Sequence, residues 1–170
     1  AVQVPGSKSM TNRALILASL SDGPSTIRHA LCSRDTELMI DALRSLGVEI
    51  SVLDGDSHLN MTLEVVPHFL GSVDSRSIDV GLAGTVMRFL PPVAGLTQGD
   101  VMFDGDRAAR RRPMATLIEA MRDVGMEVDD AGTGTLPFLI HGRGAIPGGE
   151  VIVDASRSVS YTHLTLPTNC

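Results

Sequence analysis

The sequence contains no tryptophan, one tyrosine and four phenylalanines, so its core has to be built from aliphatic residues, methionine and alanine. No apolar run approaches the ~20 residues of a membrane-spanning helix, and we expect no contact with a membrane. The only cysteines, Cys32 and Cys170, cannot form a disulfide framework, which favours a reducing, cytoplasmic location. The five histidines are not closely spaced with one another or with Cys32, so no metal site is predicted.

Positive charge is also scarce, since the formal net charge is −6. An acidic chain without stacking aromatics is a poor candidate for binding nucleic acid. Lys8 is the only lysine among the fourteen basic residues.

The length of 170 residues, with 43% hydrophobic content, is enough for one domain. Such a domain buries roughly 70% of the surface that the unfolded chain exposes.

Lys8 lies in a glycine turn that opens a helix. Gly6 permits a tight backbone and Ser7 or Ser9 can cap the helix, so several unpaired N–H groups point into one small space that attracts anions. Lys8 adds a point charge, and Arg13 adds a planar fork that matches a carboxylate or phosphate. The alternative is that these residues only cap a surface helix. The stretch is not a P-loop, because Ser7 stands where that motif requires a glycine before the lysine.

Periodicity and turn residues predict helices and strands for the first 80 residues. The expected elements are a helix over about 9–20, a strand at 25–31, a helix capped at 33–35 and closed by Gly47, strands at 48–52 and 59–66 around a turn at 54–56, and a less regular connection at 67–79.

An internal repeat then follows. Arg88 lies 75 residues after Arg13 in a similar glycine turn and helix, and residues 117–128 match residues 39–50 at an offset of 78. Each copy reads as a turn, helix, strand, capped helix ending in glycine, and two strands.

The two copies occupy about 6–66 and 81–141, and a third copy begins at 148. Two equivalent helix N-termini, each with an arginine, suit a substrate that bears more than one anionic group.

A second basic cluster precedes Pro113, which we expect to start a helix. It contains Arg107, Arg110, Arg111 and Arg112. A charge run is usually a solvated loop, and that interpretation remains open here. Arg112 is nevertheless placed to add to an anion site at the N-terminus of the following helix.

Three motifs together resemble the enolpyruvyl transferases, in particular the 5-enolpyruvylshikimate-3-phosphate synthases. They are residues 5–14, residues 81–88 and the pair Arg112-Pro113. The resemblance covers residues 1 to about 158 and implies an α/β fold of repeated βαβαββ units, with helices inside and sheets outside. It also implies transfer of the enolpyruvyl group of phosphoenolpyruvate to shikimate 3-phosphate, in aromatic amino acid biosynthesis, with no cofactor or metal.

The same resemblance implies roles for individual residues. Lys8 would touch both substrates, while Ser9 and Arg13 would hold shikimate 3-phosphate. Gly84 and Arg112 would bind phosphoenolpyruvate.

Further site residues come from the same motifs. Asp35 matches an acidic position near the site and is assigned a catalytic role beside the lysine, although it also reads as a helix cap. Thr85 and Arg88 are assigned to substrate binding. Ser158 matches the first of the serines that grip the 3-phosphate, and Ser156 is assigned to substrate binding.

The sequence departs from the family pattern at two places. Leu82 replaces an asparagine found in many members, which removes one polar contact to phosphoenolpyruvate. Residues 159–170 change abruptly to threonine and leucine and are interpreted as a non-native tail after a partial domain at 1–158, or else as a divergent terminus.

The family's second domain supplies the principal proton-transfer groups, so we expect this chain alone to be inactive. The resemblance also implies that the full-length form is monomeric.

Two other functions stay open at this point. The sister enzymes that act on UDP-N-acetylglucosamine share the fold, but they usually carry a cysteine in the loop before the Arg112 position, and residues 105–112 contain none. The other alternative is a non-catalytic anion-binding module built from the same repeats.

Overall fold

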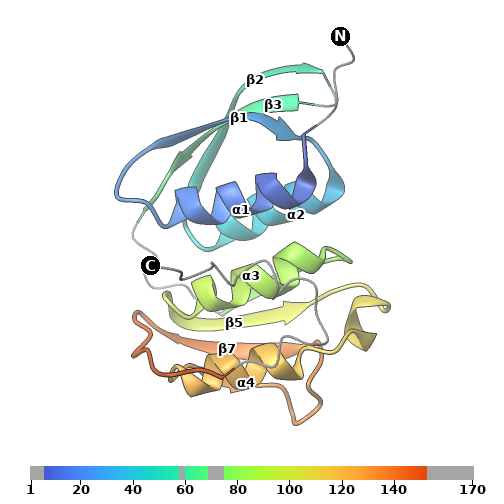
Figure 1. Ribbon diagram of the computed structural model, residues 1–170, viewed down its shortest axis with the longest axis vertical. Coiled ribbons are helices and arrows are strands. Elements are labelled where there is room, and N and C mark those ends of the chain that lie inside the picture. The colour runs from blue at the N-terminus through green and yellow to red at the C-terminus, as the bar shows by residue number, and fades with distance from the viewer. Residues whose placement is uncertain (1–5, 58–59, 69–74, 153–170) are drawn as a thin grey trace, which may run out of the picture.

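The computed structural model describes residues 6–57, 60–68 and 75–152. Figure 1 shows the helices and strands of these segments. In order they are α1 (Lys8–Ser19), β1 (Ser25–Leu31), α2 (Arg34–Ser45), β2 (Glu49–Ser57), β3 (Asn60–Val66), β4 (Arg76–Asp79), α3 (Gly84–Ala94), β5 (Gln98–Asp104), the 3₁₀ turn η1 (Ala109–Arg111), α4 (Ala115–Asp123), β6 (Glu127–Asp129) and β7 (Phe138–Arg143).

The strands form two sheets of the same design. The first has the order β1-β3-β2 and the second has the order β4-β5-β7-β6. In each sheet a hairpin strand lies between two strands that a helix connects, namely α2 between β1 and β2, and α4 between β5 and β6. The second sheet carries β4 in addition, paired parallel to β5. The predicted repeat is therefore a repeat of topology as well as of sequence.

Helices α1, α2 and α3 pack against one another between the two sheets (Figure 1). Helix α4 contacts β6. The expectation of helices inside and sheets outside agrees with this arrangement of α1, α2 and α3. One buried cluster of aliphatic and methionine side chains includes residues of both sheets and of all four helices. Phe103 and Phe138 stack inside it with ring centroids 5.4 Å apart, so the few aromatic residues do contribute to the core.

The repeat extends to hydrogen bonds at the helix ends. Arg44 at the end of α2 donates from Nε and Nη2 to the carbonyl oxygen of Ile50, at 3.1 and 2.6 Å. Arg122 at the end of α4 donates in the same way to Val128, at 3.3 and 2.8 Å. The glycine three residues after each arginine has a positive φ, +103° and +87°, which a side chain would disfavour. Each arginine thus fixes the turn between its helix and the next strand.

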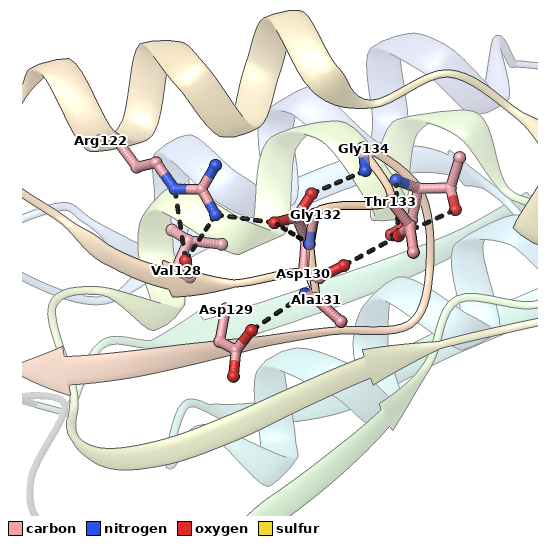
Figure 2. A network of polar contacts seen from close by, with 9 residues as sticks. Arg122, Val128, Asp129, Asp130, Ala131, Gly132, Thr133 and Gly134 are labelled. Carbon is pink, nitrogen blue, oxygen red and sulfur yellow. Dashed lines mark hydrogen bonds and ion pairs between the residues drawn. The ribbon is translucent and has the colours of Figure 1, made fainter.

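The second copy adds a buried acid to this turn, shown in Figure 2. Asp130 is 4% exposed and accepts hydrogen bonds from Arg122 Nη2 at 2.7 Å, from the Gly134 amide at 2.6 Å and from the Gly132 amide at 3.2 Å. The hydrogen bond from Arg122 holds the pKa of Asp130 below its ordinary value, and the two backbone amides act in the same direction against desolvation.

Three local predictions are wrong. The turn expected at 54–56 does not form, because β2 continues to Ser57 through irregularities in its register with β3. The connection expected at 67–79 contains the strand β4, which has too few apolar residues to show a pattern. It forms because it pairs in parallel with β5, a strand distant in sequence. Helix α4 begins at Ala115 and not at Pro113, and its N-cap residue Met114 makes no side-chain cap. The Met114 amide instead donates to the Gly134 carbonyl at 2.8 Å.

The Asp130 network predicts a stability that depends on pH. A depressed pKa means that the ionised form stabilises the fold above the unfolded-state pKa of about 3.9, and that this contribution is lost as the pH falls through the folded-state pKa. Asp130→Asn should lower the free energy of unfolding at pH 7 by about 1.5–3 kcal/mol, the range for a hydrogen bond to a charged group. Urea denaturation at pH 7 and between pH 3 and 5 measures both effects.

The neighbouring Asp129→Asn substitution is the matched control. Asp129 is exposed and accepts one bond, from the Ala131 amide at 2.9 Å. Its removal should leave the unfolding free energy nearly unchanged. Equal losses in the two variants would show that the Asp130 network is not a specific stabilising element.

Candidate anion-binding site

The N-termini of α1, α2 and α3 gather at one end of the molecule, on the right in Figure 1, where β1 and β5 also end. Helix N-termini expose unpaired N–H groups and the positive end of the helix dipole. Three of them at one place, beside the carboxyl ends of strands, form a region that favours anions. The predicted site residues within the described part of the chain lie on these helices or beside them.

Helix α1 starts where the opening motif predicts. Ser7 is its N-cap, and its hydroxyl oxygen accepts a bond from the Met10 amide at 3.4 Å. Gly6 passes so close to β1 that an added Cβ would lie 2.7 Å from the carbonyl oxygen of His29. His29 itself has a φ of +57° and lies at an irregularity in the register between β1 and β3. A glycine is therefore required at this position immediately before α1, where the backbone passes against β1.

Lys8 and Asp35 form an ion pair between the first turns of α1 and α2, with Nζ and Oδ2 3.0 Å apart. The Lys8 side chain is 62% exposed, so its ammonium stays accessible to a ligand. The interpretation of Asp35 as a helix cap is wrong, because Ser33 caps α2 and accepts from the Thr36 amide at 3.3 Å. Asp35 is free to face Lys8 because the neighbouring serine satisfies the helix end.

Asn12 joins all three helices. It is fully buried, and its Nδ2 donates to Thr85 Oγ1 in α3 at 2.6 Å and to the Asp35 carbonyl in α2 at 3.3 Å. Its Oδ1 is buried without a hydrogen-bond partner in the part of the chain that the structure describes. Sequence reasoning did not assign Asn12 to the site, although it lies within the opening motif.

Two arginines flank Gly84 at the start of α3. A Cβ added to Gly84 would lie 3.2 Å from Nη1 of Arg88 and 3.2 Å from Nη1 of Arg112. Arg112 Nη1 also donates to the Leu82 carbonyl at 3.3 Å, and Arg88 Nη1 donates to the Gly84 carbonyl at 3.5 Å. The structure thus brings Gly84, Arg88 and Arg112 together, and the absence of a side chain at Gly84 leaves room for both guanidinium groups.

A second ion pair, not foreseen from the sequence, links the two copies. Arg34 at the start of α2 donates to both carboxylate oxygens of Asp106, at 3.2 and 3.3 Å. This hydrogen bonding raises the pKa of Arg34. Arg34 also lies against Gly81, where a Cβ would be 3.2 Å from its Nη2. The only sequence signal for the pair was charge beside a predicted cap, which is common on surfaces.

Within the part of the chain that the structure describes, the arginines before Pro113 differ in their partners. Arg110 donates from Nε and Nη2 to the Asp104 carboxylate at 2.8 and 2.6 Å, which lowers the pKa of Asp104. Arg107 and Arg111 are exposed. The solvated-loop interpretation therefore describes Arg107 and Arg111, whereas Arg112 turns toward Gly84.

The remaining predicted residues are Ser9 and Arg13 on α1, and Ser156 and Ser158 further along the chain. Ser9 is half-buried in the first turn of α1. Arg13, also on α1, lies over the ring of Phe89 in α3, with Cζ 5.5 Å from the ring centroid. Ser156 and Ser158 lie outside the described residues.

The described residues, 6–57, 60–68 and 75–152, lack two classes of feature. No helix there is long and apolar enough to cross a membrane. No group of three or more His, Cys, Asp or Glu side chains in the same ranges could hold a metal ion.

Comparison with known proteins identifies one family. The family model described as EPSP synthase (3-phosphoshikimate 1-carboxyvinyltransferase) matches residues 1–166. A 3-phosphoshikimate 1-carboxyvinyltransferase of Kocuria rhizophila is 46% identical over 167 residues, which are 97% of this chain and 38% of that relative. This chain therefore spans well under half the length of that relative.

Solved structures agree at the level of the fold. An EPSP synthase from Acinetobacter baumannii superposes with a TM-score of 0.68 and 24% identity, over 85% of this chain and 32% of that one. The enolpyruvyl transferase NikO from Streptomyces tendae gives a TM-score of 0.50 and 19% identity, over 83% of this chain and 32% of its own. The family model matches almost the whole sequence, the identity to the curated relative is high over the same span, and the chain belongs to the EPSP synthase family.

Proposed function

We propose that this chain carries part of an active site that transfers the enolpyruvyl group of phosphoenolpyruvate to shikimate 3-phosphate. The observation that carries the proposal is the meeting of three helix N-termini, with the Lys8–Asp35 pair on one side and Gly84 between Arg88 and Arg112 on the other. Both substrates are anions with more than one charged group, and the name of the Kocuria rhizophila relative supports the same reaction.

The proposed division of work follows from the contacts. Arg112 and Arg88 supply planar forks beside Gly84 for the carboxylate or phosphate of phosphoenolpyruvate. The exposed Lys8 ammonium, held beside Asp35, would lie between the two substrates. An ion pair of an ammonium and a carboxylate can deliver and accept a proton when a ligand displaces one partner. Positioning of two anions and proton transfer are the two requirements of this reaction.

Other predicted residues take part in the proposal through contacts on α1 and α3. Ser9 and Arg13 on α1 would contact shikimate 3-phosphate, and Thr85 would help to shape the start of α3 through its bond with Asn12. Ser158 would contact the 3-phosphate, as the family resemblance implies, and Ser156 would take part in substrate binding.

The proposal also covers how much of the enzyme this chain represents and how the chain divides into units. Since it spans 38% of the curated relative, we expect turnover to require groups beyond this chain. Units at 6–66 and 81–141, a third unit from 148, and a non-native segment at 159–170 also remain predictions. The last segment lies outside the described residues, and the family match continues as far as residue 166. A cytoplasmic location and a monomeric full-length protein are proposed on the family resemblance.

A binding measurement tests the substrate class. We expect the 170-residue chain to bind shikimate 3-phosphate more tightly than shikimate or inorganic phosphate, in calorimetric titrations, and to release no phosphate from the substrate pair. Lys8→Met should weaken the binding of shikimate 3-phosphate by at least about tenfold, because a hydrogen bond to a charged group contributes about 1.5–3 kcal/mol. Arg143→Met is the control, because Arg143 pairs with Glu127 on the second sheet and takes no part in the site. Equal affinities for all three compounds would contradict the proposal and favour a general anion-binding module.

Gly84 gives a second test of the proposed phosphoenolpyruvate site. The methyl group of Gly84→Ala would press on both Nη1 atoms at 3.2 Å, so the two guanidinium groups must move. We expect the affinity for phosphoenolpyruvate to fall at least threefold, because hydrogen bonds to charged groups lose strength when misaligned. The melting temperature should not fall, since Gly84 has no positive φ.

The control for this test is Gly23→Ala. An added Cβ at Gly23 has no neighbour within 4 Å, and its φ is not positive. That variant should bind phosphoenolpyruvate like the wild type. A Gly84→Ala variant with unchanged affinity would show that the gap between the two arginines is not a binding site.

A further inference from the structure

Arg13 has an unusual environment for an arginine in this protein. Among the described residues it makes no ion pair and no hydrogen bond, whereas Arg34, Arg110 and Arg122 each bind a carboxylate. It is half-buried, and its guanidinium lies over the ring of Phe89, with 5.5 Å from Cζ to the ring centroid. Its N–H donors therefore have no partner among residues 6–57, 60–68 and 75–152, while the Phe89 ring supports one face of the guanidinium.

Phe89 is placed differently from the phenylalanines of the core. Phe103 and Phe138 are fully buried and stack on each other. Phe89 is half-buried on α3, on the side where α3 meets α1. In the first copy of the repeat, the residue equivalent to Phe89 lies 75 positions earlier, and it is Ala14. The aromatic support thus exists in one copy of the repeat and serves an arginine of the other.

Stacking on a ring and binding an anion use different parts of a guanidinium group. The ring attracts the face of the cation, and the N–H donors point outward in its plane. A stacked guanidinium loses less rotational freedom when an anion arrives, because its orientation is already restricted. Helix α3 cannot easily shift away from α1, since the buried Asn12 amide bonds to Thr85 one turn before Phe89. The support is consequently rigid.

We infer that Phe89 is a positioning residue, which holds the Arg13 guanidinium flat so that its in-plane donors face a phosphorylated ligand at the N-terminal end of α1. The inference rests on the proposed function for the identity of that ligand. A residue of the second copy of the repeat thus orients the anion-binding arginine of the first copy.

The test follows the Arg13 side chain directly in the 170-residue chain. The ¹⁵Nε–Hε resonance of Arg13, assigned from its loss in Arg13→Lys, is recorded by NMR while inorganic phosphate is added. We expect phosphate to shift this resonance with saturation. Phe89→Leu should move the resonance in the free protein, because the ring current is lost, and should raise the dissociation constant for phosphate about two- to fivefold, the range for an exposed cation–π contact.

Two further variants separate positioning from stability. Phe89→Trp should keep or improve the affinity for phosphate, because tryptophan is the best aromatic partner for a cation. Phe138→Leu removes an aromatic ring from the core and should lower the melting temperature without changing the affinity for phosphate in the folded protein.

The inference is overturned if phosphate does not shift the Arg13 resonance, if Phe89→Leu leaves both the resonance and the affinity unchanged, or if Phe138→Leu weakens binding equally. Shikimate 3-phosphate is then added to the same samples. If it binds no better than phosphate while Phe89→Leu still weakens both, the proposed substrate is wrong but the role of Phe89 stands.

Discussion

The buried amide of Asn12 connects the three helices on which the candidate site depends. One side chain donates to Thr85 in α3 and to the Asp35 carbonyl in α2, and it does so from the second turn of α1 with no exposure to solvent. A buried polar group is costly unless it is paired, so these bonds strongly restrict how the helices can move relative to one another. The same packing of α1 against α2 and α3 brings Lys8 beside Asp35 and Arg13 over Phe89.

The site is built by repetition with local differences. Both copies of the repeat use the same topology and the same arginine at the end of their second helix. At the other end of the helices the copies diverge. The first supplies a serine cap, Lys8 and a supported Arg13, whereas the second supplies a bare Gly84 between two arginines. A symmetric scaffold with unlike residues at equivalent positions suits two different anionic substrates bound side by side.

Charge in this acidic chain is used locally. Arg34, Arg110 and Arg122 are neutralised by Asp106, Asp104 and Asp130, and these pairs hold loops and helix ends in place. Arg13 has no such partner among the described residues, and Arg88 and Arg112 contact only backbone carbonyls there. Arg34, Arg110 and Arg122 are therefore structural, whereas Arg13, Arg88 and Arg112 lie around the region where the helix dipoles favour an anion.

Sequence alone determined most of the elements, the repeat and the family, because periodicity, caps and glycine turns are local properties and the three motifs are specific, while the site residues it indicates stay predictions. The limits of β1 and the Ser33 cap of α2 illustrate this. Tertiary structure decided what local patterns cannot express. The strand β4 exists because β5 pairs with it, Asp35 faces Lys8 because Ser33 already caps its helix, and the pairs Arg34–Asp106 and Arg13–Phe89 join residues 72 and 76 positions apart. Such contacts depend on how whole helices pack, and no spacing in the sequence encodes them.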